Sequence, residues 1–68
     1  MLNVRELRAA IVRKGLTQRQ VAQKCGMSEK TFISRMKNGA FGTDEAQILI
    51  ELLDIKNPVE IFFASNLT

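Results

Sequence analysis

The 68-residue sequence contains no histidine, tryptophan or tyrosine, and its only cysteine is Cys25. A single cysteine excludes a disulfide within the chain, and the lack of histidine leaves no cluster of the usual metal ligands. Catalytic arrangements are missing too, because no nucleophile–base pair or carboxylate pair stands at catalytic spacing. We therefore expect no enzyme, no metal or cofactor site and no small-molecule ligand.

Long apolar runs are also lacking. No stretch approaches the length of a bilayer-spanning helix, and residues 1–6 lack the apolar segment of a signal peptide. We therefore expect a cytoplasmic protein with no membrane partner. With one proline and no low-complexity tract, residues 1–68 are expected to form a single domain.

The residues that are present suit a small folded domain with an excess of positive charge. A hydrophobic content of 46% indicates a globular chain rather than a disordered one. The formal net charge is +3 and the pI is about 9.5. This balance suits a polyanionic partner, although many small domains are mildly basic without one.

Three helix starts can be recognised in the first half of the chain. Asn3, Thr17 and Ser28 are residue types that favour the N-cap, and a Glu or Gln follows three positions after each of the first two. Gly26 can adopt the left-handed conformation that ends the second helix. The apolar residues expected to face the core are Leu7, Ala10, Ile11, Val21, Ala22, Cys25, Phe32 and Met36.

Two more helices are expected in the second half. One begins near Gly42 or Thr43, with acidic residues in its first turn. The other begins at Pro58, directly after the capping residue Asn57. Phe41, in the loop between the third and fourth predicted helices, is expected to fold back on the core. Five short helices with short connections predict an all-α, compact five-helix bundle.

The fourth predicted helix is apolar around more of its surface than one core requires. Its expected core residues are Ala46, Leu49, Ile50 and Leu53. Ile48 and Leu52 then fall on a second face, which suggests contact with a partner. We therefore name Ile48 and Leu52 as candidate dimer contacts. The alternative is that a wider core covers them.

The segment from Leu16 to Phe32 has the sequence L-T-Q-R-Q-V-A-Q-K-C-G-M-S-E-K-T-F. It resembles the motif L-T-Q-x-x-L-A-x-x-x-G-[VM]-S-x-x-T-[IF] of the lambda-repressor-like helix-turn-helix family, which includes phage repressors, Cro proteins and Xre-type regulators. Residues 41–55 and 58–63 are similar to helices 4 and 5 of small phage-encoded members. The resemblance covers nearly the whole chain.

This resemblance implies a transcriptional regulator of phage or mobile-element Cro/repressor type. Such a protein binds double-stranded DNA as a homodimer on a palindromic operator, and its third helix, here about residues 28–38, contacts the major groove. By the same resemblance, the base-contacting residues are Glu29, Lys30, Thr31 and Ser34. The phosphate-contacting residues are Gln18, Ser28, Arg35, Lys37, Asn38 and Thr43.

Simpler interpretations stay open for three of these residues. Glu29 is favourable near a helix N-terminus for the helix dipole alone. Thr31 can complete a capping turn, and Lys30 can be a solvated surface charge. A measurement of binding to duplex DNA distinguishes a contact with DNA from these local roles.

The sequence departs from the family pattern in two places. The interval Gly26–Gly39 is one residue longer than in the commonest members, which leaves either Ser34 or Arg35 as the outer base-contacting residue. Ile11 and, approximately, Met36 stand where many members carry a paired Arg and Glu. An apolar pair there avoids the desolvation penalty of a buried ion pair.

A function of another class is compatible with the same fold. The domain could be an antirepressor or modulator that pairs with a larger repressor through the apolar faces of helices 4 and 5. A third interpretation is an excisionase-like protein that bends DNA. The residues specify neither the operator nor the direction of regulation.

Overall fold

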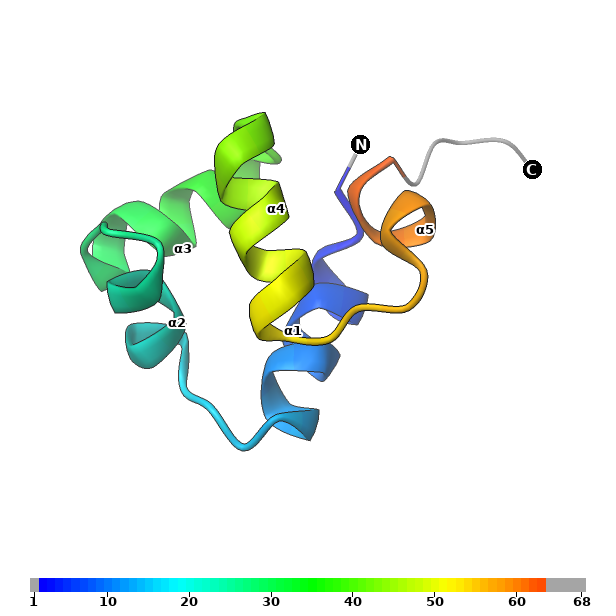
Figure 1. Cartoon of the computed structure of the whole chain (residues 1–68). Helices are drawn as coiled ribbons and strands as arrows, with labels where there is room; N and C mark the ends of the chain where they lie inside the picture. Colours follow the sequence, from blue (N-terminus) through cyan, green and yellow to red (C-terminus); the bar gives the residue numbers. More distant parts are fainter. Residues whose placement is uncertain (1, 64–68) are drawn as a thin grey trace.

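The computed structural model describes residues 2–63, which form five helices and no strand (Figure 1). The helices are α1 (Val4–Arg13), α2 (Gln18–Lys24), α3 (Glu29–Asn38), α4 (Thr43–Leu52) and α5 (Pro58–Phe62). In Figure 1, α2 and α3 lie on the left and α5 on the right, with α1 and α4 between them. The predicted all-helical architecture is confirmed for the described residues.

Side chains cap the N-termini of the first three helices, as the sequence predicts. Asn3 Oδ1, Thr17 Oγ1 and Ser28 Oγ each accept a hydrogen bond from the backbone N–H three residues later, at 3.2, 3.1 and 3.1 Å. Gln20 Oε1 also accepts from the Thr17 N–H at 2.8 Å, which completes a capping box. Each such cap stabilises its helix by about 1 kcal/mol, so these positions fix where the first three helices begin.

Two glycines end helices in the left-handed conformation. Gly26 ends the α2 segment with φ 75°, and Gly39 ends α3 with φ 64°. The residue after each glycine donates its N–H back to the helix, at 3.0 Å after Gly26 and 2.9 Å after Gly39. A side chain at either glycine would be strained in this conformation. The turn between α2 and α3 is therefore set by local backbone chemistry.

The core is apolar and receives side chains from all five helices. Its buried residues are Leu7, Ala10, Ile11, Val21, Ala22, Phe32, Met36, Leu49, Leu53 and Ile61. Phe41 folds back from the loop after α3, as predicted, and its ring centroid lies 5.4 Å from that of Phe32. The N-terminal segment is held to α5 because the Asn3 N–H donates to the Ile61 carbonyl at 2.7 Å.

The orientation of α4 agrees with the prediction only in part. Leu49 and Leu53 are buried as expected, but Leu52 also packs against the core. Ile50 and Ala46, expected to face the core, are half-buried and line a groove with Phe62 of α5. The physical reason is that α4 covers two neighbours at once, so its apolar surface is divided between the main core and α5.

Candidate nucleic-acid interface

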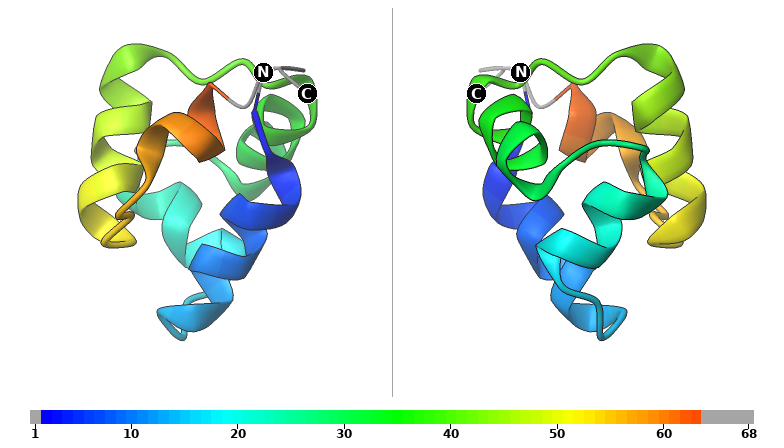
Figure 2. Two further views of the ribbon diagram at one scale, coloured as in Figure 1. Left: turned by 90° about the vertical axis from the view of Figure 1, so that its right-hand side faces the viewer. Right: turned by 90° about the vertical axis from the view of Figure 1, so that its left-hand side faces the viewer.

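The helices α2 and α3 form the most extensive helix–helix contact of the described chain. They are joined by the short turn 25–28, and the right panel of Figure 2 looks onto this pair. Val21 and Ala22 of α2 and Phe32 of α3 are fully buried in the contact with the rest of the core. The pair is therefore anchored on one side, and its other side is left to solvent.

The outward surface of α3 is a strip of exposed side chains. It consists of Glu29, Lys30, Ile33, Ser34 and Lys37, called the α3 strip below. Positions 30, 33, 34 and 37 recur at i, i+3, i+4 and i+7, so they share one side of the helix. On the other side, Phe32 and Met36 are 0% and 1% exposed. A helix of this length presents a strip about 15 Å long.

Two lysines give the α3 strip its positive charge. Lys30 and Lys37 are both exposed, and neither takes part in an ion pair within residues 2–63. The ion pairs in that range join Arg35 to Glu45, Lys14 to Asp54 and Lys56 to Asp54. Glu29 is the acidic residue of the strip, and it lies in the first turn of α3, where the helix dipole favours it.

The hydroxyl of Thr31 takes part in the α3 cap. Ser28 Oγ donates to Thr31 Oγ1 at 2.9 Å, while it accepts from the Thr31 backbone N–H. Thr31 is half-buried, unlike the residues of the α3 strip. Its polar atoms therefore serve the capping turn, which was the simpler interpretation of this residue. Of the predicted base-contacting residues, the structure brings Glu29, Lys30 and Ser34 together in the strip.

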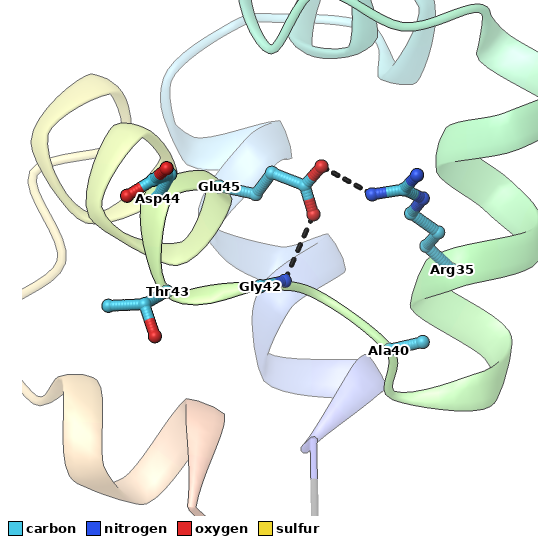
Figure 3. A pocket seen from close by; sticks show the side chains of 6 residues that line it. All are labelled: Arg35, Ala40, Gly42, Thr43, Asp44 and Glu45. Atoms are coloured by element: carbon cyan, nitrogen blue, oxygen red, sulfur yellow. Dashed lines mark hydrogen bonds and ion pairs between the residues drawn. The ribbon is translucent and has the colours of Figure 1, made fainter.

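Arg35 is turned towards α4 rather than along the α3 strip. Its guanidinium forms an ion pair with the Glu45 carboxylate, and the other Glu45 oxygen accepts from the Gly42 N–H at 3.0 Å (Figure 3). The Gly42 N–H and then Arg35 hold the pKa of Glu45 below its ordinary value. The two side chains therefore connect α3, the following loop and the start of α4. Of the two candidates for the outer base-contacting position, Ser34 is exposed and Arg35 is half-buried.

The ion pair between Arg35 and Glu45 is not predicted by any pattern in the sequence. Arg35 and Glu45 are ten residues apart, on different helices, so no helical periodicity relates them. The nearest signal was the placement of Glu45 three residues after Gly42, which is the spacing of a capping residue. The pair lines an open hollow of about 590 Å³ that also contains Asp44. With two carboxylates beside one guanidinium, this hollow has no excess positive charge.

The other predicted phosphate-contacting residues lie before, within and after the α3 strip in sequence. Gln18 is the first residue of α2 and is half-buried, whereas Ser28 is the exposed cap of α3. Lys37 and Asn38 form the exposed C-terminal end of α3, and Thr43 is the exposed first residue of α4. Polar groups are thus available before and after the strip.

The two predicted dimer contacts differ in exposure. Ile48 is 37% exposed, whereas Leu52 packs against the core. Besides Ile33 in the α3 strip, three further large apolar residues are exposed, namely Val12 at 73%, Val59 at 67% and Phe63 at 68%. Phe63 also borders the groove between α4 and α5, which has a volume of about 300 Å³.

Cys25 is the half-buried C-cap residue of α2. Burial raises the pKa of the Cys25 thiol, which disfavours the reactive thiolate. Among residues 2–63, no three or more acidic, histidine or cysteine side chains gather as a metal site would require. No helix in that range is both long enough and apolar enough to cross a bilayer.

Comparison of the chain with protein-family models, with curated proteins and with solved structures found no match. The functional proposal for this chain therefore rests on its own residues and geometry.

Proposed function

We propose that this chain is a sequence-specific regulator of transcription that binds double-stranded DNA through a lambda-repressor-like helix-turn-helix formed by α2 and α3. It acts by binding, without catalysis or a cofactor. The observation that carries the proposal is the α3 strip, a polar and basic helix surface backed by the fully buried Phe32. The major groove is about 12 Å wide and admits one helix.

The residues of the strip suit the edges of base pairs. Lys30 can donate to guanine O6 and N7, and Glu29 can accept from the cytosine amino group. Ser34 can donate or accept, so it suits several bases. The exposure of all three supports direct contact with DNA.

Groups on either side of the strip suit the phosphates. The Gln18 amide can donate to a phosphate on one side, and Lys37 with Asn38 can bind the backbone on the other. Such contacts set the register of the protein on DNA but do not distinguish sequences. Arg35 contributes less than expected, because Glu45 already neutralises its charge.

Recognition of a palindromic operator requires a symmetric dimer. Two copies of α3 would then enter the groove about 34 Å apart, one turn of DNA. Ile48 is the more exposed of the two proposed dimer contacts, and the α4–α5 groove lies on the same helix. We therefore propose a homodimer that involves α4.

The second candidate is a protein-interaction module, an antirepressor or modulator. The apolar groove lined by Ala46, Ile50, Phe62 and Phe63 favours it, because an apolar helix of a partner could bind there. Under this alternative the α3 strip has no role in binding. Substitutions in α4 and α5 would then abolish activity, and substitutions in the α3 strip would not.

Selection from a random duplex library tests the main proposal. The expected result is enrichment of two inverted half-sites whose centres are about ten base pairs apart. Binding to the enriched duplex should weaken steeply with salt, because lysine contacts release counterions from phosphates. A library that shows no enrichment, or binding that is insensitive to salt, would contradict the proposal and favour the interaction module.

A further inference from the structure

Ile33 is an apolar residue within the polar α3 strip. Its side chain is 36% exposed, and it belongs neither to the buried core nor to the residues packed against that core. Its neighbours one turn away are Glu29, Lys30 and Lys37, and Ser34 follows it directly. More than a third of this large β-branched residue is therefore open to solvent, beside the charged residues of the strip.

We propose that Ile33 is a specificity-determining residue that packs against the 5-methyl group of a thymine. This inference rests on the proposed binding of α3 in the major groove. The thymine methyl is the apolar group that unmodified base pairs present there, and apolar side chains contact it. Ile33 thus adds an apolar contact to the hydrogen-bonding groups of Lys30, Glu29 and Ser34.

The surroundings of Ile33 favour DNA over a protein partner. A protein interface has a largely apolar core from which charged residues are depleted. The other exposed large apolar residues, Val12, Ile48, Val59 and Phe63, lie on α1, on α4 or around α5, and none of them lies on α3 (Figure 1). Ile33 instead stands alone between lysines, which complement a polyanion.

The helix geometry limits where the thymine lies. Lys30 and Ile33 are three residues apart, a rise of about 4.5 Å along α3. One base step along a strand is about 3.4 Å. The methyl group should therefore lie within about two base pairs of the base that Lys30 contacts.

Replacement of thymine by uracil removes only the methyl group and tests this contact. The probe is the duplex most enriched from the random library, with each thymine changed to uracil in turn. The affinity of the unaltered protein should fall roughly fourfold at one thymine per half-site, as expected for one buried methyl group. Ile33→Ala should bind the thymine and uracil duplexes equally, whereas Ile33→Val should keep a preference for thymine.

Val12→Ala is the control, because Val12 is an apolar residue of α1 that is 73% exposed and lies outside the surfaces assigned to DNA binding and dimerisation. This variant should keep the full difference between thymine and uracil. The control shows that the loss in Ile33→Ala comes from the α3 strip and not from loss of exposed apolar surface in general.

The outcomes separate this inference from the proposed function. Specific binding that is indifferent to uracil at every thymine would overturn the role of Ile33 and leave the DNA-binding proposal standing. An unchanged uracil penalty in Ile33→Ala, together with weaker self-association, would overturn it in favour of a protein contact. If Ile33→Ala does not fold, the scan of the unaltered protein and Ile33→Val still decides. If no duplex is enriched, the proposed function fails first and this inference falls with it.

Discussion

At the scale of single residues, α3 places a buried and a partly exposed apolar side chain next to each other. Phe32 is fully buried against Phe41, whereas Ile33 beside it is 36% exposed. Both are large and apolar, so composition alone does not distinguish them. Helical periodicity predicts Phe32 and Met36 as core residues, but it does not reveal how much of Ile33 stays exposed. That depends on how α4 and α1 pack, which is a tertiary property.

Substitution of these neighbours should affect stability very differently. Phe32→Ala should lower the free energy of unfolding by about 3–5 kcal/mol, because it removes a buried ring and leaves a cavity. Ile33→Ala, one position along, is the matched control and should change it by about 0.5 kcal/mol or less. Urea denaturation followed by circular dichroism measures both. Equal losses would mean that Ile33 is part of the core.

At the scale of helices, the local signals in the sequence were sufficient to place the starts of α1, α2 and α3. Asn3, Thr17 and Ser28 all accept the hydrogen bond that their spacing predicts. Such caps depend on residues three positions apart, so the sequence carries the whole signal. The ion pair between Arg35 and Glu45 joins two helices, and no local rule predicts it.

The Glu45 carboxylate, which accepts from the Gly42 N–H and pairs with Arg35, should make stability depend on pH at the acid end. The pKa of Glu45 is below its ordinary value of 4.5 in the folded protein. Its contribution is therefore complete above that pH and is lost as the pH falls through the lower, folded-state value. Glu45→Gln retains an oxygen that can accept from the Gly42 N–H but removes the charge.

The free energies of unfolding of the unaltered protein and Glu45→Gln should thus differ at pH 7 and converge below pH 4.5. Glu51→Gln is the control, since Glu51 is exposed on the same helix and bonds only Gln47. It removes the same charge but not the ion pair. A difference for Glu45→Gln that stays constant with pH would contradict the role of the pair.

The same variant should change DNA binding. Without the Glu45 charge, the Arg35 guanidinium becomes available to a phosphate, and one more phosphate contact makes the slope of log affinity against log salt more negative by about 0.9. Binding titrations at several salt concentrations measure this slope. Glu51→Gln should leave the slope nearly unchanged. An unchanged slope in Glu45→Gln would mean that Arg35 does not reach the backbone even when released.

At the scale of the whole molecule, the sequence predicted an all-helical bundle because each helix carries its own apolar periodicity and boundaries. The sequence predicted less well which apolar residues of α4 face the core and which face the groove. Leu52 packs against the core, whereas Ile50 lines the groove beside α5. The apolar positions of α4 surround the helix, so periodicity permits several orientations, and only packing against two neighbours selects one.

The position of Leu52 separates two substitutions that would otherwise seem equivalent. Ile48→Lys should weaken dimerisation with little loss of stability, because Ile48 is already 37% exposed. Leu52→Lys should lower the midpoint of thermal unfolding as well, since it introduces a charge beside the core. Sedimentation velocity and thermal denaturation measure the two effects. A fully dimeric Ile48→Lys would place the interface elsewhere, with Val59 and Phe63 as the next residues to test.

The most direct test of the α3 strip as a DNA-binding surface is the affinity of one double variant. Lys30→Ala combined with Ser34→Ala removes two polar groups of the strip, and fluorescence anisotropy with the enriched duplex measures the result. Lys56→Ala is the control for charge, because the Lys56 side chain is 82% exposed and pairs with Asp54 in the connection before α5. We expect the double variant to lose affinity by about thirtyfold or more, at about 1–3 kcal/mol per base contact, and Lys56→Ala to bind nearly as the unaltered protein does. Equal affinities for the double variant and the Lys56→Ala control would contradict the assignment of DNA binding to α3.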